Sequence, residues 1–359
     1  MSNYFVAKAG WQLGLAAIFW TADTPAQTSN PEGRPPARQT GQHDFAGYQL
    51  NLDNDFFVPG STDRWYTNGL RLAWTYKTPS NNPWVQGVLA SARDWDLIDA
   101  EPTLTYSVGQ SMYSPRAVSV ATAQPLDRPW GGFLYGGITA QAYKGPRFAA
   151  TEIKVGVTGP LALAAPLQSA WHNLIGSPQP VGWSQQLAGR PALQISHTRQ
   201  YRHPNFSGDQ LAFQTGWGGA VGNLRVYGNV NASLIWGDLQ GSTTPTLIAN
   251  EGDFVVLDLE DRAMFKRPFG YFSVGMNLVA YNYFITGPTP YGNTELRTNP
   301  VFGTAQIGIS LPTQQWLGKQ APRLVYALNI RSAEFRSVGL EQMGGVQRWG
   351  SLTLNWDLR

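Results

Sequence analysis

Segments of about ten residues, each alternating between apolar and polar side chains, recur along most of this chain. The last of them reads Ser351-Leu352-Thr353-Leu354-Asn355-Trp356. Because successive side chains of a β-strand point to opposite faces, each such strand has one apolar and one polar face. Segments of this length, bounded by Gly, Pro, Asn and Asp, are typical of transmembrane β-strands. The pattern predicts a sheet with lipid on one side.

About thirteen segments fit this pattern, whereas bacterial single-chain barrels have even numbers of strands. The weakest candidate is residues 253–262, because Asp258, Glu260 and Asp261 would put charges on both faces. We interpret it as a connecting segment. The prediction is an all-β fold, a transmembrane antiparallel β-barrel of about twelve strands over residues 45–359.

A secreted, soluble β-sandwich is the alternative, since it also alternates in short strands. Composition favours the barrel: charged residues make up 14% of the chain, below the roughly 25% of soluble domains, while Gly (39), Trp (14) and Tyr (15) are frequent. The net charge of +3 comes without a block of Lys and Arg, so a nucleic-acid surface is not supported. With no cysteine, disulfides and thiolate metal sites are excluded.

The N-terminal residues have the order of a secretory signal. Lys8 precedes an apolar run over residues 9–22, and small residues follow up to Ala26. This predicts a signal peptide over residues 1–26, with an uncleaved N-terminal helix as the alternative. Residues 27–44, rich in Pro, Gln, Thr and Arg, are expected to be disordered. Beyond them no apolar run reaches the roughly 18 residues of a transmembrane helix.

One segment between residues 159 and 182 has helical rather than strand periodicity. Its apolar residues share one face of a helix: Leu163, Leu167, Trp171 and Leu174. Gln168 and His172 lie four residues apart and therefore stack on one side. We expect a short amphipathic helix in an extracellular loop.

Polar residues gather at one rim of the predicted barrel. If the first strand rises from the periplasm, Asn54, Thr67, Gln110, His172 and the loop 218–223 all lie at the outer rim. Alternation puts Asn54 and Gln110 on the lipid-facing side of their strands. Thr67 has the opposite parity unless a β-bulge intervenes. A site here would open toward the outer leaflet rather than the lumen.

His172 is the histidine best placed for catalysis, as a general base that activates water. A packed or solvated helical histidine is the alternative. Three other histidines are expected to be structural: His43, His197 and His203. The sequence contains no GxSxG elbow, no HExxH and no GKS or GKT phosphate loop, so a serine esterase is poorly supported.

Oxygen ligands and cations also lie near this rim. Asp55, Asn54 and Thr67 could hold Ca²⁺, or the Asn-Asp pair could simply end a strand. Three arginines are candidates for phosphate contacts, with solvated surface charge as the alternative: Arg64, Arg71 and Arg116.

Six short motifs occur in order along the chain. They are Asn54-Asp55, Asp63-Arg64-x-Tyr66-Thr67-x-Gly69, Gln110-x-x-Tyr113-Ser114-Pro115, Gln168-x-x-x-His172-x-x-Ile175-Gly176, Gly182-Trp183 with Gln186-Leu187, and Gly222-Asn223-Leu224. Together they resemble the LpxR-type outer-membrane lipid A 3′-O-deacylases, from about Tyr48 to Arg359.

This resemblance implies a twelve-stranded outer-membrane barrel with a calcium-dependent site between its outer wall and a loop helix. Such an enzyme hydrolyses the 3′-linked acyloxyacyl ester of lipid A, the lipopolysaccharide anchor in the outer leaflet. His172 would be the base, Gln168 would support it, and the calcium and oxyanion site would be formed by Asn54, Asp55 and Thr67. One departure is Pro178, where some members of the family have a glutamate.

Two other functions remain open from the residues alone. A non-enzymatic barrel, such as a small porin or a structural protein, could share the scaffold. An outer-membrane phospholipase could use the same base and cation, because the residue types do not distinguish lipid A from a glycerophospholipid.

Overall fold

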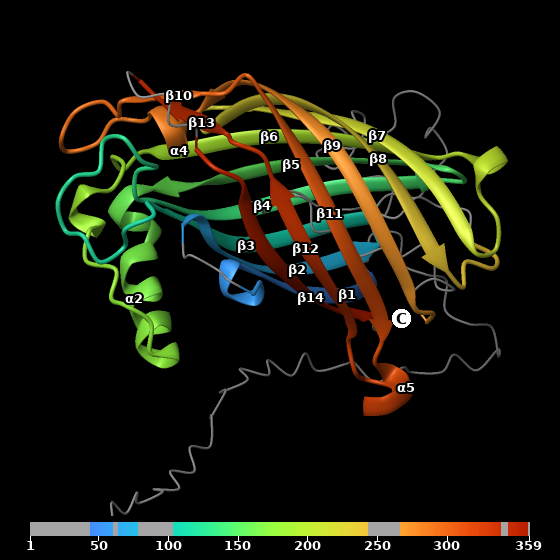
Figure 1. Ribbon diagram of the computed structural model, residues 1–359. Helices are drawn as coiled ribbons and strands as arrows, with labels where there is room; N and C mark the ends of the chain where they lie inside the picture. The colour runs from blue at the N-terminus through green and yellow to red at the C-terminus, as the bar shows by residue number, and fades with distance from the viewer. Residues whose placement is uncertain (1–43, 60–63, 78–102, 243–265, 339–343, 358–359) are drawn as a thin grey trace, which may run out of the picture. The chain divides into compact units, whose positions relative to one another are not determined.

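The computed structural model describes residues 44–59, 64–77, 103–242, 266–338 and 344–357. The predicted signal peptide (1–26), residues 27–43 of the predicted disordered segment, His43 and the connecting segment 253–262 lie outside these ranges. Twelve strands close into one antiparallel barrel, which confirms the predicted fold class (Figure 1). They are β1 (Asp44–Asn54), β2 (Trp65–Lys77), β3 (Thr103–Ser114), β4 (Gly131–Lys144), β5 (Arg147–Thr158), β6 (Pro191–Arg202), β7 (Leu211–Gly222), β8 (Arg225–Gly237), β9 (Phe269–Asn282), β11 (Val301–Pro312), β12 (Arg323–Arg331) and β14 (Gln347–Asp357).

The barrel closes between its first and last strands. β1 pairs with β14 in a register that runs from Gly47 opposite Asp357 to Asn54 opposite Gly350. The segment 218–223, expected as a loop, is instead the end of β7 followed by Asn223, because the alternation continues to Gly222. A separate two-stranded sheet joins β10 (Leu296–Thr298) to β13 (Phe335–Ser337).

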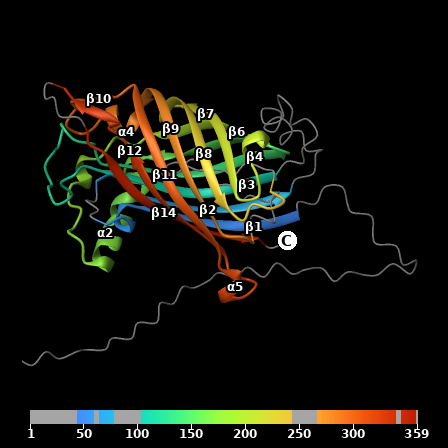
Figure 2. The same ribbon diagram turned by 45° about the vertical axis from the view of Figure 1, so that its right-hand side comes forward.

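Short helices lie at the two ends of the barrel. The longest, α2 (Ala164–Ile175), lies at one end, hereafter the α2 end, and α5 (Gln314–Leu317) lies at the other (Figures 1 and 2). The remaining ones are η1 (Asp55–Phe57), η2 (Gly159–Ala162), η3 (Trp183–Gln185), η4 (Pro204–Phe206) and α4 (Tyr283–Thr286). In the described part of the chain, every helix is too short or too polar to cross a membrane.

The wall has apolar side chains outside and polar side chains inside. On β5, Val155 is 60% exposed on the outer face, whereas Glu152 on the inner face is fully buried. The same contrast recurs on β9, where Leu278 is exposed and Ser273 is buried. A soluble protein has the opposite distribution, with polar side chains outside and apolar ones inside. The distribution seen here suits a wall in contact with hydrocarbon, because lipid solvates the apolar side chains while the polar ones find hydrogen-bond partners in the lumen.

Side chains fill the lumen at the α2 end. An aromatic cluster contains Tyr66, Tyr113, Phe133, Tyr135, Phe284 and Trp349. Beside it, Glu334 forms ion pairs with Arg128 at 2.7 Å and with Arg331 at 3.0 Å. Two cavities between these groups measure about 30 Å³ each, roughly the space of one or two waters. Such packing is typical of a filled barrel rather than an open pore.

Candidate active site

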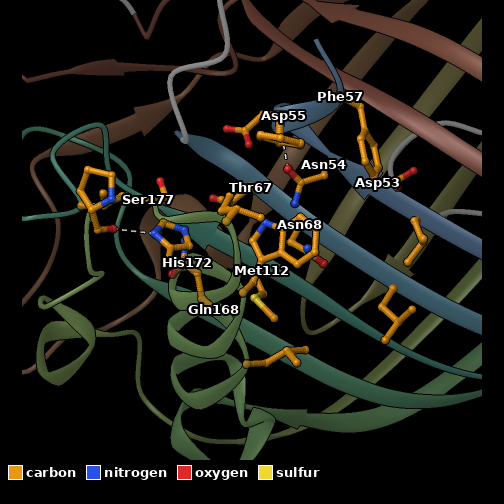
Figure 3. A pocket seen from close by; sticks show the side chains of 18 of the residues that line it. Asp53, Asn54, Asp55, Phe57, Thr67, Asn68, Met112, Gln168, His172 and Ser177 are labelled. Atoms are coloured by element: carbon orange, nitrogen blue, oxygen red, sulfur yellow. Dashed lines mark hydrogen bonds between the residues drawn. The ribbon is translucent and has the colours of Figure 1, made fainter. Parts of the chain in front are cut away.

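A cavity of about 640 Å³ lies on the outside of the wall, between strands β1 to β3 and helix α2 (Figure 3). Its polar lining includes Asn54, Asp55, Thr67, Asn68, Gln168 and His172. Its apolar lining includes Leu52, Leu70, Met112, Leu167, Trp171 and Ile175. The structure thus brings together all five residues predicted for the site, and the cavity can hold a ligand that is partly apolar and partly polar.

A β-bulge in β2 turns Thr67 to the outer face. The register of β2 against β3 shifts between Tyr66 and Asn68, so Thr67 is an extra residue with no partner of its own in β3. Tyr66 therefore points into the lumen, while Thr67 and Asn68 both line the cavity. The Thr67 hydroxyl lies 2.6 Å from the hydroxyl of Ser114. The bulge resolves the parity conflict between Thr67 and Asn54.

Asn54 ends β1 and caps the helical turn η1. Its Oδ1 accepts a hydrogen bond from the Phe56 N–H at 2.7 Å, as an N-cap residue does. This contact orients the amide, so that its NH₂ group is directed toward the cavity (Figure 3). The neighbouring Asp55 carboxylate accepts the Arg64 backbone N–H at 3.0 Å. Both side chains are buried.

Helix α2 presents its polar side to the barrel wall. Gln168 and His172 are 3% and 2% exposed, whereas Leu163 and Leu174 on the other side are exposed. A soluble amphipathic helix would have the opposite arrangement. Here the polar groups are enclosed between the helix and the wall, and the leucines face outward as the wall's apolar side chains do.

Small residues and one glutamine hold the helix against the wall. Gln110 of β3 donates its amide N–H to the carbonyl of Ala162 in η2. A Cβ on Gly132 of β4 would lie 2.7 Å from the Cβ of Ala164 and 3.0 Å from that of Ala162, so only glycine allows this approach. Gln110, predicted at the rim, therefore anchors the helix rather than lining the cavity.

The His172 ring is oriented by a backbone carbonyl. Its Nδ1 lies 2.5 Å from the carbonyl oxygen of Pro178 (dashed line in Figure 3). Because a carbonyl only accepts, Nδ1 carries the proton and Nε2 of the neutral ring is an acceptor. Gly176, at φ 70°, ends the helix, and Ser177 donates its N–H to the His172 carbonyl. This turn brings the Pro178 carbonyl to the ring, so the contact that orients His172 does not depend on the side chain at position 178.

Gln168 is oriented by Trp183, whose role the sequence did not reveal. The Trp183 indole N–H donates to Gln168 Oε1 at 2.9 Å. Since an indole N–H can only donate, the amide atom that faces it must be the oxygen of Gln168, and the NH₂ group points the other way as a donor. That Nε2 is buried and has no hydrogen-bond partner among the described residues. Trp183 itself packs on Trp130 with ring centroids 4.9 Å apart. The Gly182-Trp183 motif was the available signal for this contact.

Two aromatic side chains face each other across the cavity mouth. Phe56 of η1 and Trp171 of α2 meet edge to face, with centroids 6.2 Å apart and an interplanar angle of 86°. Phe56 is 56% exposed, so this contact lies at the surface. With Leu52, Leu70 and Met112 beneath, the lining suits a flexible hydrocarbon chain.

The arginines near the rim separate into two environments. Arg71 points into the lumen and pairs with Glu152 at 2.6 Å, so it is no candidate for contact with an external phosphate. Arg116 lines the cavity and Arg64 lies beside it. Burial lowers the pKa of the Arg64 guanidinium, and the nearby charge of Arg116 lowers that pKa further.

The remaining histidines of the described chain lie away from this cavity. His197 Nδ1 is 2.9 Å from the hydroxyl of Thr151, and His203 Nε2 is 2.8 Å from that of Thr215. The first contact joins β5 to β6, and the second joins the residue that follows β6 to β7, which is consistent with structural roles.

The cavity contains oxygen atoms of the types that bind hard cations such as Ca²⁺. Asp55 offers a carboxylate, Thr67 a hydroxyl, and Asn54 Oδ1 has a second lone pair beside its capping bond. Within the described ranges, however, no group of three or more Asp, Glu or His side chains is arranged to hold a metal ion. A Ca²⁺ ion would therefore take further ligands from backbone carbonyls, water or substrate. The directed NH₂ of Asn54 suits an anion better than a cation.

A closed barrel with an apolar exterior and a polar cavity on its outer wall defines an integral membrane β-barrel whose site faces lipid. The chain belongs to the LpxR family: the family described as "Outer membrane protein LpxR" matches residues 13–358. The outer membrane is therefore its location.

Comparison with solved structures agrees on the fold. "LpxR from Salmonella typhimurium" superposes with a TM-score of 0.65 at 18% sequence identity, over 87% of this chain and 100% of that one. The "TodX monoaromatic hydrocarbon channel deltaS2 mutant" gives a TM-score of 0.34 at 7% identity, over 89% of this chain and 91% of that one, which carries no argument. Among curated proteins, none matches the sequence.

Proposed function

We propose that this protein is an outer-membrane lipid A deacylase that hydrolyses the 3′-linked acyloxyacyl ester of lipid A. The observation that carries the proposal is the buried His172, whose ring leaves Nε2 as an acceptor in a cavity that opens outside the barrel wall. Membership of the LpxR family and the six ordered motifs support the substrate assignment.

The reaction needs one base and one water. With the acyl chain along Leu52, Leu70 and Met112, the ester carbonyl lies near His172. Nε2 accepts a proton from water as the water oxygen bonds to the carbonyl carbon. The ester C–O bond then breaks, and the imidazolium returns the proton to the departing sugar oxygen. The products are a carboxylic acid and a free hydroxyl group.

In this mechanism two amide groups stabilise the negative charge that develops on the carbonyl oxygen. The NH₂ groups of Gln168 and Asn54 are oriented by their other contacts, so they need no reorganisation when the charge forms. Ca²⁺ held by Asp55, Thr67 and Asn54 would supply additional positive charge at the same place. No serine nucleophile is required.

The alternatives differ in what they demand of the barrel. An open porin needs a continuous lumen, whereas aromatic and ionic side chains pack the lumen at the α2 end. A phospholipase would use the same residues on another ester, so it is separated from the proposal by the identity of the lipid product.

Mass spectrometry of lipid A from cells that express the wild type or His172→Ala tests the proposal. We expect the wild type to remove the 3′ chains and the variant to lose activity by roughly 100-fold or more. His197→Ala, a change of the same type on the wall, should retain activity. Unmodified lipid A in wild-type cells supplied with calcium would refute the proposal, and release of phospholipid acyl chains would favour the phospholipase.

A further inference from the structure

Three arginines from separate segments of the chain gather at the rim beside the cavity. Arg64 directly precedes β2, Arg116 follows β3, and Arg348 lies at the start of β14. The Arg64 guanidinium stacks 4.6 Å from the centroid of the Trp65 ring, and that of Arg116 lies 5.9 Å from the same ring. The charge of Arg348 also acts on Arg64. We call these three residues the rim arginines.

The rim arginines lie next to the polar end of the cavity. Arg116 is part of its lining, and the Arg64 backbone N–H contacts the Asp55 carboxylate. Arg348 lies two residues before Gly350, which pairs directly with Asn54. A ligand held by these three side chains would extend its remainder toward Asn54 and His172.

Their charges are left without ion pairs in the described part of the chain. Arg116 and Arg348 are exposed, whereas the buried Arg71 and Arg128 each pair with a glutamate. The nearby Asp127 carboxylate accepts N–H groups from the Trp65 indole and from the backbone of Arg116. At Arg64 the charges of Arg116 and Arg348 act against the guanidinium, whereas those of Asp127 and Asp55 favour it. The two carboxylates compensate the three cations only in part, so an external anion would stabilise the cluster further.

We propose that the rim arginines bind a phosphate monoester on the headgroup of the lipid whose ester is hydrolysed in the cavity. Guanidinium groups match phosphate oxygens in pairs, and a monoester carries up to two negative charges near neutral pH. The contact orients the lipid with its phosphate at the rim and its acyl ester beside His172. This inference rests on the proposed function.

Kinetics with two substrates tests the subsite. Free lipid A, whose anionic groups are its phosphates, is compared with the same lipid after dephosphorylation, for the wild type and the double variant Arg116→Gln/Arg348→Gln. We expect the double variant to raise KM for phosphorylated lipid A by roughly 10- to 100-fold, with kcat nearly unchanged and KM for the dephosphorylated lipid unaffected. Arg336→Gln removes an exposed charge from β13 at the same end and should change neither value.

Equilibrium binding separates this inference from the proposed function. The His172→Ala variant should bind a fluorescent analogue of phosphorylated lipid A more tightly than its dephosphorylated counterpart, and removal of Arg116 and Arg348 should abolish the difference. This result would support the subsite even if the wild type hydrolysed neither lipid. Equal affinity for both lipids, or an equal rise in KM for both, would overturn it.

Inorganic phosphate distinguishes the two sources of the anion. We expect it to displace phosphorylated lipid A only at concentrations far above those of the lipid, because it lacks the acyl chains that the cavity binds. Displacement at comparable concentrations would assign the rim arginines to free phosphate and refute the headgroup.

Discussion

Single residues decide which polar groups reach the cavity. Parity along β1 predicted the outward position of Asn54 correctly, because alternation is a local property of a strand. The position of Thr67 depended on a bulge that only the pairing of β2 with β3 reveals. Likewise the orientation of His172 rests on the Pro178 carbonyl, which any residue at that position would provide.

The substitution Asp55→Asn tests the calcium proposal. The asparagine can still accept the Arg64 N–H through its amide oxygen, so the turn should survive while the negative charge is lost. We therefore expect activity to fall more at low than at high calcium, because a weaker site needs more ion. Lipid A hydrolysis measured over a calcium titration provides the measurement.

Asp209→Asn serves as the control for this change, since Asp209 is an exposed carboxylate at the opposite end of the barrel. Its calcium dependence should equal that of the wild type. A loss in Asp55→Asn that is the same at every calcium concentration would argue against Asp55 as a ligand.

The helix α2 shows what periodicity can and cannot predict about an element. The spacing of Leu163, Leu167 and Leu174 correctly indicated an amphipathic helix, and the i, i+4 pair of Gln168 and His172 correctly indicated a shared side. Which side faces the protein was not evident, because a helix beside lipid can expose its apolar face. The structure turns the polar side toward the wall, where Gln168 and His172 line the cavity between α2 and strands β1 to β3.

Gly132→Val tests the seating of this helix on the wall. A Cβ at Gly132 would lie 2.7 Å from that of Ala164, so the valine should displace α2 and move His172 from its place. A misplacement of about 1 Å can cost on the order of 100-fold in rate, and we expect a loss of at least tenfold. The heat-dependent gel mobility of the folded barrel should remain.

Gly136→Val is the matched control, since Gly136 lies on the same face of β4 and its nearest neighbour for a Cβ is a carbonyl oxygen 4.0 Å away. It should retain wild-type activity. Equal losses in the two variants would show that β4 tolerates no side chain there and that the seating of α2 is not the cause.

Across the barrel as a whole, a buried ionic network connects strands β2, β4 and β5 inside the lumen. Glu152 of β5 accepts from Arg71 at 2.6 Å and lies 3.1 Å from the ammonium group of Lys154, and the Thr139 hydroxyl donates to it at 3.2 Å. All four side chains are buried. The carboxylate thus forms ion pairs with two buried cations.

Glu152→Gln should therefore destabilise the barrel. It removes the buried carboxylate that forms ion pairs with Arg71 and Lys154, and breaking a buried ion pair from one side typically costs about 3–5 kcal/mol. Urea unfolding in lipid bilayers measures this loss, and Thr139→Val, which removes one neutral hydrogen bond to the same carboxylate, should cost only about 1 kcal/mol. Folded Glu152→Gln should keep its activity, because Glu152 faces the lumen. Equal stability of Glu152→Gln and the wild type would contradict this account.

Alternation and helical spacing are local patterns, so the amino-acid sequence was enough to predict a barrel of about twelve strands, the loop helix and the candidate base. Three features became evident only in the folded chain: the outward turn of Thr67, the contact of Trp183 with Gln168, and the separation of Arg71 from Arg64 and Arg116. Each of these depends on segments far apart in the chain that strand pairing brings into contact.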